Sequence, residues 1–459
     1  MNVFIRFKRY LAIMLGLTSM LGKASLIAGA GTFQLGGVQF DSEFGENGVV
    51  RTNFYYGIEN DEGAAILLQK DGRIVLTGSL VLTMMPEYYQ YSQGAIALAR
   101  LNKDGSLDET FGDNGMTLTL FTDEIVKVTD AVVDYSGNIL VAGYINCRTD
   151  DFLLVRYSPD GELDYTFGEN GIVITDFNER DDRAYRLKID HMGKIILSGE
   201  SSNVDGTIRD TALARYNTDG SKDMDFGTYG TIVADLFNEE DAAHDLVVDS
   251  AGKILITGYT GIKKKHSNII LARFNYDGSQ DATFGDSGRV KFKSSNFEIG
   301  TQIKLLPKGR LLVLGTTRWQ SNSNKTDLCL IRCLWDGSFD QSFGNGGNVK
   351  SDFGGSELGI ALFGQAGGKV LVAMKSFISS DDKINYDGSE ELVLALYNWN
   401  GTLDKDFGDN GFLKTDFFED HDHIKDAVMP LGGKIVVGGF VRKNGYTKND
   451  FAVAQYTLQ

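Results

Sequence analysis

The residues best suited to hold a metal ion stand in one short run, Glu419-Asp420-His421-Asp422-His423. Carboxylate oxygens and imidazole nitrogens are common ligands of divalent cations, and His421 and His423 share one face if the segment is extended. The run is therefore a candidate site for a divalent cation, with a solvated acidic rim as the simpler interpretation. The sequence indicates no other cofactor.

A second set of candidates is aromatic and lies in irregular segments. Tyr88, Tyr89 and Tyr91 fall in a predicted loop from Leu80 to Gly94, and Trp319 begins another predicted loop. Aromatic rings in such places stack on sugars or anchor a protein partner. They also pack against their own loops, and the sequence favours neither interpretation. These four residues are the candidate ligand-binding residues.

A turn pattern resembles the front half of a calcium loop. It reads Asn217-x-Asp219-Gly220-x-x-Asp223, and close copies begin at Asn102 and Asn275. Calcium loops alternate oxygen ligands around a glycine, but they end on a bidentate glutamate that is missing here. We therefore interpret the pattern as a turn stabilised by its own Asn and Asp side chains.

An arginine recurs in one predicted strand, at Arg100, Arg156, Arg215, Arg273 and Arg332, with Leu396 and Gln455 at the two remaining equivalent positions. Arginines repeated around a ring could read a ligand. A partly buried guanidinium needs an acidic partner, however, and a nearby repeated aspartate supplies one. We expect each arginine to pair with an aspartate of its own or the next repeat.

Catalytic residues are not indicated. The sequence contains no nucleophile-elbow, zinc-protease or phosphate-loop motif, and its 5 histidines share no repeated position. Acidic pairs are plentiful, but sequence alone does not say which of them converge.

The repeated aspartate begins the pattern D-x-x-F-G-x-x-G, which occurs seven times, with its phenylalanine at Phe44, Phe111, Phe167, Phe226, Phe284, Phe343 and Phe407. Successive copies are 56 to 67 residues apart. A regular period of this size indicates one closed repeat domain. We expect the phenylalanine to fill the space between neighbouring repeats.

Each repeat holds four predicted strands. In one of them these are Ala184 to Asp190, Lys194 to Gly199, Asp210 to Tyr216 and Gly230 to Phe237. Short runs rich in Ile, Val and Leu, separated by Gly and Asp, are typical of strands joined by tight turns. Four antiparallel strands in each of seven repeats predict an all-β fold, a seven-bladed β-propeller.

The two ends of the repeat array are complementary. The segment Gly48 to Phe54 matches the fourth strand of a repeat, and the chain ends on Asp450 to Thr457, which matches the third. We therefore predict that the N-terminal strand completes the last blade and closes the ring. Closure leaves no unpaired sheet edge.

The units at Leu213 to Gly230 and Leu271 to Gly288, with Asp-Gly in the turn and D-x-x-F-G-x-x-G after it, resemble the delta-60 repeat family of bacterial exported propellers. The resemblance extends over nearly all of the chain after residue 30. It implies the propeller fold and an exported bacterial setting, and it implies little about function. The sixth repeat departs most, with Met374 and Leu396 in place of the usual Gly and Arg.

The first thirty residues differ in kind. Arg6, Lys8 and Arg9 precede an apolar run, Tyr10 to Leu21, and Ala28-Gly29-Ala30 forms a small-residue cleavage site. This order predicts a signal peptide, residues 1–30, followed by the propeller, residues 31–459. An uncleaved anchor is the alternative, but the apolar run is short for one. We expect a protein exported to the periplasm, the cell surface or the medium.

Charge and cysteine content narrow the partners. The formal net charge of −17 becomes −21 once the leader is removed, which disfavours nucleic acid and anionic membranes. The three cysteines, Cys147, Cys329 and Cys333, are interpreted as core residues. We expect a monomer whose partner is a protein or a carbohydrate.

Two functions remain open. One is a binding or scaffold module that uses the irregular loops of one face. The other is an extracellular enzyme, a polysaccharide hydrolase or lyase, with its site at the channel mouth. The enzyme requires titratable side chains from different blades to converge in a pocket. A catalytic role is the less favoured of the two, and a purely structural role is a third interpretation.

Overall fold

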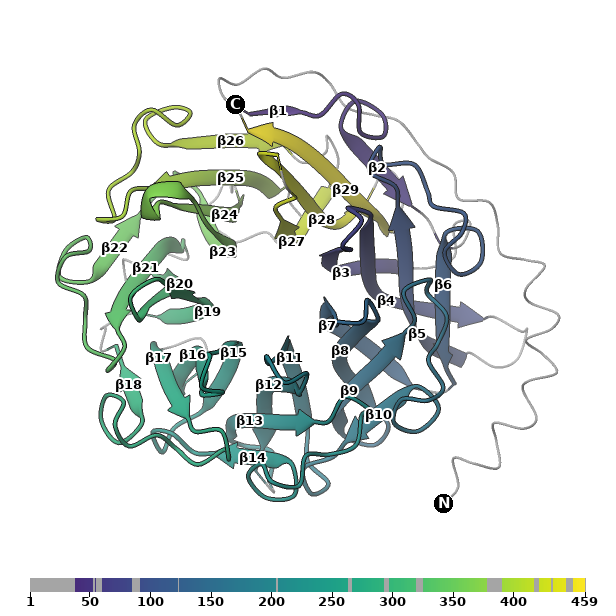
Figure 1. The fold of residues 1–459 in the computed structure, drawn as a ribbon, viewed down its shortest axis with the longest axis horizontal. Helices are drawn as coiled ribbons and strands as arrows, with labels where there is room; N and C mark the ends of the chain where they lie inside the picture. The colour runs from purple at the N-terminus through teal and green to yellow at the C-terminus, as the bar shows by residue number, and fades with distance from the viewer. Residues whose placement is uncertain are drawn as a thin grey trace.

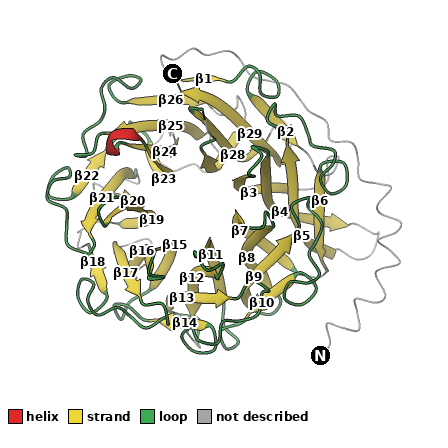
Figure 2. Cartoon of the chain, viewed as in Figure 1, coloured by secondary structure: helices red, strands yellow, loops and turns green. Residues whose placement is uncertain are grey.

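The computed structural model describes residues 38–52, 54, 60–84, 91–122, 124–203, 205–262, 266–292, 297–318, 325–377, 390–416, 421–430, 432–442 and 449–458. In these residues 29 strands form seven antiparallel sheets arranged around a central axis (Figure 1). One short 3-10 helix, Ala366–Gly368, accompanies them (Figure 2). The predicted seven-bladed β-propeller is confirmed.

The blades are numbered in chain order, and each lists its strands from the axis outward. Blade 1 contains β3 (Asn60–Leu68), β4 (Ile74–Met84), β5 (Tyr91–Leu101) and β6 (Met116–Phe121). Blade 2 contains β7 (Ile125–Val133), β8 (Ile139–Asn146), β9 (Asp150–Tyr157) and β10 (Ile172–Thr175). Blade 3 contains β11 (Asp182–Ile189), β12 (Ile195–Ser202), β13 (Arg209–Tyr216) and β14 (Thr231–Ala234). Blade 4 contains β15 (Asp241–Val248), β16 (Ile254–Ile262), β17 (His266–Phe274) and β18 (Arg289–Lys291).

Blade 5 contains β19 (Glu298–Leu306), β20 (Arg310–Thr317), β21 (Asp327–Leu334) and β22 (Asn348–Ser351). Blade 6 contains β23 (Ser356–Gly364), β24 (Val370–Phe377), β25 (Glu390–Tyr397) and β26 (Phe412–Asp416). Blade 7 contains β27 (His421–Val428), β28 (Lys434–Arg442) and β29 (Asn449–Leu458), and its outer positions are filled by β1 (Val38–Phe40) and β2 (Val49–Thr52).

Closure of the ring follows the prediction and adds one strand to it. β2 pairs antiparallel with β29, from Val49 opposite Ala454 to Thr52 opposite Phe451. β1, which the sequence did not reveal, pairs with the far end of β29, with Val38 opposite Leu458. The two N-terminal strands together cover the outer edge of β29 from Phe451 to Leu458.

Three sequence predictions need correction. The predicted loop from Leu80 to Gly94 is largely strand, because β4 runs to Met84 and β5 begins at Tyr91. The fourth strand of blade 3 is shorter than predicted and covers Thr231–Ala234. Cys329 and Cys333 are buried as predicted, but Cys147 is exposed in the connection that follows β8.

The core lies between neighbouring sheets. The repeated phenylalanine is 0–3 % exposed in six of the seven copies, which confirms its predicted role as a plug, whereas Phe407 is only partly buried. The two glycines of the motif have the left-handed backbone that glycine adopts without strain, as Gly168 (φ 52°) and Gly171 (φ 93°) show. The motif thus sets a tight turn that holds a large apolar side chain between two sheets.

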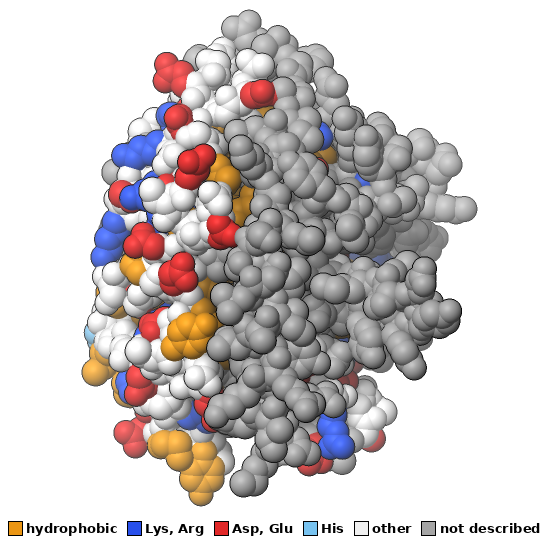
Figure 3. Space-filling model, turned by 90° about the vertical axis from the view of Figure 1, so that its right-hand side faces the viewer, with side chains coloured by type: hydrophobic (Ala, Val, Ile, Leu, Met, Phe, Trp, Pro, Cys, Tyr) orange, Lys and Arg blue, Asp and Glu red, His pale blue; other side chains and the backbone are white. Residues whose placement is uncertain are grey.

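The two faces of the ring differ in their connections. Tight turns between strands one and two, and between three and four, form what we call the turn face. Connections between strands two and three, and from each blade to the next, form the loop face. Figure 3 shows acidic and basic side chains intermixed on the described part of one side of the ring, with apolar side chains in small groups. Among the described residues there is no helix with the length and apolar character that crossing a bilayer requires.

Candidate functional site

The repeated arginines are bonded within the framework. Each donates Nε–H or Nη–H to the aspartate of D-x-x-F-G in its own blade, at 2.7–2.9 Å in the pairs Arg100–Asp108, Arg156–Asp164, Arg215–Asp223, Arg273–Asp281 and Arg332–Asp340. The predicted pairing is confirmed. We call this pair, with the phenylalanine beneath it, the clasp.

The clasp also reaches the next blade. Arg100 Nη1 donates to the carbonyl of Pro159 at 2.7 Å, and Arg273 Nη1 donates to that of Trp335 at 2.6 Å. The guanidinium lies 4.4–4.7 Å from the motif phenylalanine ring in all five blades. Where the arginine is missing in blade 7, Gln455 Nε2 donates to Asp41 at 2.7 Å. These arginines are therefore occupied by structural contacts.

The side-chain oxygens of the calcium-like turn are used in hydrogen bonds within the turn. Asp219 Oδ1 accepts the backbone N–H and the hydroxyl of Ser221 at 2.9 and 2.6 Å, and Asn217 donates to the same hydroxyl. Asp104, Asp277 and Asp336 repeat the arrangement with the serine two residues later. The oxygens satisfy the turn itself, as the simpler interpretation predicted.

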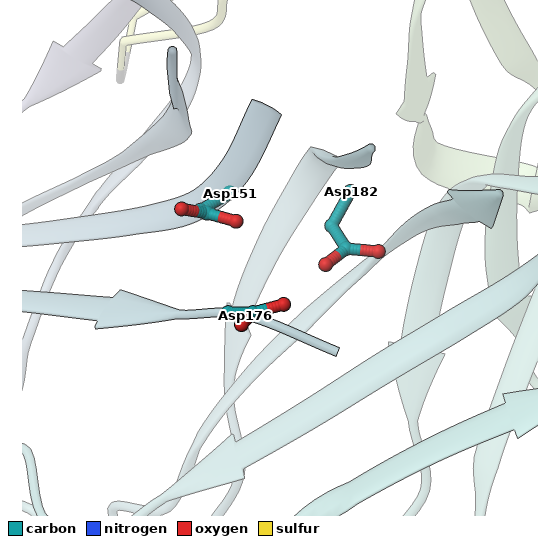
Figure 4. A group of neighbouring side chains, drawn as sticks. All are labelled: Asp151, Asp176 and Asp182. Atoms are coloured by element: carbon teal, nitrogen blue, oxygen red, sulfur yellow. The ribbon is translucent and has the colours of Figure 1, made fainter. Parts of the chain in front are cut away.

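A different acidic group stands on the loop face, between blades 2 and 3. Asp151 lies at the start of β9, Asp176 follows β10, and Asp182 begins β11 of the next blade. Their carboxyl groups lie close together (Figure 4), and one oxygen of each lies within 4.8 Å of the others. We call such a group a junction triad.

The junction triad is a repeated feature. The first two members occupy positions opposite each other just beyond the last paired residues of strands three and four. The third stands two residues before the bulge of the next inner strand. The same positions hold Asp210, Asp235 and Asp241 between blades 3 and 4, and Asp327, Asp352 and Glu357 between blades 5 and 6.

Burial perturbs these acids. Asp182 is fully buried; its Oδ2 accepts the N–H of Phe177 at 2.7 Å, while Oδ1 accepts no hydrogen bond from the described residues. Burial raises the pKa of Asp182 to about 7, with the charges of Asp151 and Asp176 adding to the effect. Burial likewise raises the pKa of Glu357 to about 7 and that of Asp241 to about 6. Each triad thus holds a buried carboxyl group whose charged form a neighbouring cation would favour.

An aromatic and charged group forms a second candidate at the loop-face ends of blades 3 and 4. The rings of Tyr185, His244 and Tyr259 form a chain with centroids 5.3 and 5.4 Å apart. Glu200, which is fully buried, lies beside it and pairs with Arg209 at 2.9 Å. Burial, and next the negative charge of Glu200, raise the pKa of Tyr185 well above its usual range. We call these five residues the mouth cluster.

The axis of the ring carries acids that tie the inner strands together. Asp130 Oδ2 accepts the N–H of Leu187 in the next blade at 2.8 Å, and Asp245 accepts that of Ile303 at 2.8 Å. Arg186 lies between these two carboxylates, 3.9 and 3.8 Å away. A cavity of about 390 Å³ opens at the turn-face ends of these strands, lined in part by Tyr135, Lys188 and His191.

The residues predicted from sequence fall in several places. Tyr88, Tyr89, Trp319, Glu419 and Asp420 lie outside the described residues. Tyr91 is the first residue of β5 and His421 the first of β27; the side chains of both are outside the described set.

The other two predicted metal ligands point to different partners. Asp422 is buried and accepts the N–H of Glu390 at 2.8 Å, in the position that Asp182 takes in its triad. His423 Nδ1 lies 3.0 Å from Glu390 Oε1, and its ring packs on Phe440. The strand register therefore puts Asp422 with Glu391 and Asp416 at the junction of blades 6 and 7.

The junction triads and the mouth cluster were missed from the sequence. The triads left a readable signal, since acids recur at the same three offsets in several repeats. The mouth cluster gave no such signal in the sequence, because its residues do not recur at the equivalent positions of other repeats. They are brought together only by the packing of blade 3 against blade 4.

Four segments of the chain, residues 87–111, 136–167, 193–226 and 252–284, match a family described as domain of unknown function (DUF5122) beta-propeller. No curated protein matches the sequence. Among solved structures, a protein of unknown function from Dyadobacter fermentans is 11% identical, covering 93% of this chain and 100% of its own, with a TM-score of 0.44.

Two further solved structures are similar. The β-propeller domain of the trilobed protease from Pyrococcus furiosus is 10% identical, covering 86% of this chain and 93% of its own, with a TM-score of 0.42. An ulvan lyase of a polysaccharide lyase family is 9% identical, covering 88% of this chain and 95% of its own, with a TM-score of 0.46. The four sequence matches support a β-propeller repeat family of unknown function for this chain, and the delta-60 name stays a prediction.

Proposed function

We propose that this chain is an exported binding module whose rigid propeller presents a neutral carbohydrate site on the loop face. The observation that supports it is the mouth cluster, where three aromatic rings in edge-on and tilted contact lie beside a buried carboxylate and a guanidinium. Carbohydrate sites combine an aromatic surface for the apolar face of a sugar with a few fixed polar groups for its hydroxyls. In the mouth cluster the partly exposed Tyr185 and His244 supply the aromatic surface and the partly exposed Arg209 supplies a polar group, while Tyr259 and Glu200 are fully buried.

The polar groups around the cluster are held in place, which favours recognition. Arg183 Nε donates to Asp150 at 2.6 Å, and its guanidinium lies over the ring of Tyr144. Residues of blade 2 thus extend the polar surface next to Tyr185. By contrast, the repeated polar groups of the turn face are used in clasps and turns. The strongly negative net charge of the chain favours a neutral sugar over an anionic one.

The enzyme remains a second candidate because of one observation. Side chains from blades 6 and 7 converge where His423 Nδ1 and Lys375 Nζ each lie 3.0 Å from Glu390. Burial lowers the pKa of the neighbouring Lys425 to about 8. Glu390 itself is buried, yet its bonds to His423, Lys375 and the N–H of Ile424 lower its pKa, so it stays charged and is committed to these contacts. That commitment favours a structural role for the carboxylate.

Binding to immobilised neutral glycans, followed by calorimetric titration of the hits, tests the proposal. Tyr185→Ala should weaken binding at least about tenfold, because it removes one stacking surface. Tyr229→Ala is the matched control, since this tyrosine is 71% exposed and lies in a turn-face motif. Equal affinity of Tyr185→Ala and the parent chain would refute the mouth cluster as the site. Depolymerisation of a glycan that His423→Ala abolishes would favour the enzyme.

A further inference from the structure

We propose that the three junction triads are calcium sites that tie each blade to the next on the loop face. The inference does not depend on the proposed carbohydrate binding. It rests on three features: the spacing of the carboxylates, the orphaned oxygen in each triad, and a comparison among the junctions of this one chain.

The spacing suits calcium. Calcium binds oxygen ligands at about 2.3–2.6 Å, so oxygens on opposite sides of the ion are about 4.6–5.2 Å apart. One oxygen from each acid of a triad lies within 4.8 Å of the other two. Magnesium binds at about 2.0–2.1 Å and draws its ligands closer together. Main-chain carbonyls and water complete such sites in other proteins.

Each triad contains a fully buried acid with one oxygen left over. Oδ1 of Asp182, Oδ1 of Asp241 and Oε2 of Glu357 accept no hydrogen bond from the described residues. The hydroxyls of Ser201 and Thr260 stand opposite Asp182 and Asp241 and favour their charged forms, but neither reaches Oδ1 with hydrogen-bond geometry. A buried carboxylate oxygen without a donor is costly, and a cation between the three acids removes that cost.

Two other junctions act as internal controls. Between blades 1 and 2 the equivalent positions hold Ala95, Leu120 and Val126, so a blade junction needs no acid to form. Between blades 4 and 5 the third position is Glu298, which is buried and bound by Lys350 Nζ at 2.9 Å. The chain therefore supplies a lysine where a lone acid is buried, and it places three acids together at the junctions we assign to calcium.

The test is calorimetric titration of the full mature chain with CaCl2 at pH 7.5, together with thermal unfolding with and without EDTA. The exposed member of each triad can be changed without disturbing the core, in the triple variant Asp176→Asn, Asp235→Asn and Asp352→Asn. A matched control removes the same charge from exposed turn-face acids, in Asp113→Asn, Glu169→Gln and Asp286→Asn.

We expect up to three calcium ions per chain, with dissociation constants of about 10⁻⁴ to 10⁻³ M, as in extracellular calcium modules. The melting temperature should rise with calcium concentration, since the ion binds the folded state alone. The triad variant should lose at least about tenfold in affinity, and the control should keep the response. No heat and no melting shift at millimolar calcium would overturn the proposal. Equal loss in both triple variants, or an equal response to MgCl2, would overturn the calcium assignment.

Discussion

The clasp of blade 3 offers the sharpest test of how the ring is held. Arg215 is fully buried, pairs with Asp223 at 2.8 Å, donates to the carbonyl of Tyr276 in blade 4 and packs its guanidinium on Phe226. The perturbation is Arg215→Leu, the residue that stands at this position in the sixth repeat. It is combined with Asp223→Asn in a double-mutant cycle.

The magnitudes follow from what each change leaves behind. Arg215→Leu removes a cation from the ring of Phe226 and a donor from Tyr276, but Asp223 keeps Lys194 at 2.9 Å. We expect a loss of about 3 kcal/mol of unfolding free energy. Asp223→Asn leaves the buried guanidinium without its carboxylate and should cost about 3–5 kcal/mol. The double variant should lose less than the sum, with a coupling energy of about 1.5–3 kcal/mol.

Urea unfolding followed by fluorescence of the 3 tryptophans measures each corner of the cycle. The control is the more exposed pair of Lys291 and Glu239, where Lys291→Leu should cost less than about 1 kcal/mol. A coupling energy below about 0.5 kcal/mol would refute the argument, because it would show that the buried pair contributes no more than two independent side chains.

Three further predictions concern the strands, the closure and the acids. Gly258→Ala should destabilise the fold by about 3 kcal/mol or more in urea titration, because its Cβ would lie 1.8 Å from the carbonyl oxygen of Ala242; a stable variant would contradict this contact. A chain beginning at residue 53 lacks β1 and β2 and should aggregate in light scattering, and added peptide 38–52 should restore a monomer by pairing with β29; a monomer without the peptide would disprove the role of closure. In EDTA the melting temperature should fall as pH rises from about 4 to about 7. The reason is that the pKa values of Asp182 and Glu357 are raised in the folded state, so the folded state holds protons that the unfolded state releases. A melting temperature that does not change over this pH range would argue against these shifts.

Features that recur in every repeat could be predicted from the sequence. The period of the phenylalanines predicted seven blades, and the match of Gly48 to Phe54 with a fourth strand predicted ring closure. The pairing of arginine with the motif aspartate could be predicted because burying a charge without an oppositely charged partner costs free energy. Each of these depends on a local pattern that recurs.

Features that depend on stacking could not be read in the same way. β1 has only three residues, too few to show an alternating pattern. The members of a triad lie on two blades, so Asp151 and Asp182 meet only because β9 and β11 belong to adjacent sheets. The mouth cluster occurs once, and no period marks it.

The pairing of β1 and β2 with β29 determines when, during folding, the ring can close. Asp41 and Gln455, which bond across this closure, are separated by 414 residues. Bringing such distant ends together costs about 5 kcal/mol in chain entropy, so six blades must form before closure becomes favourable. A chain whose last strand is still held by the ribosome therefore remains an open ring. The closed propeller can form only after both the N-terminal strands and β29 are free to pair with each other.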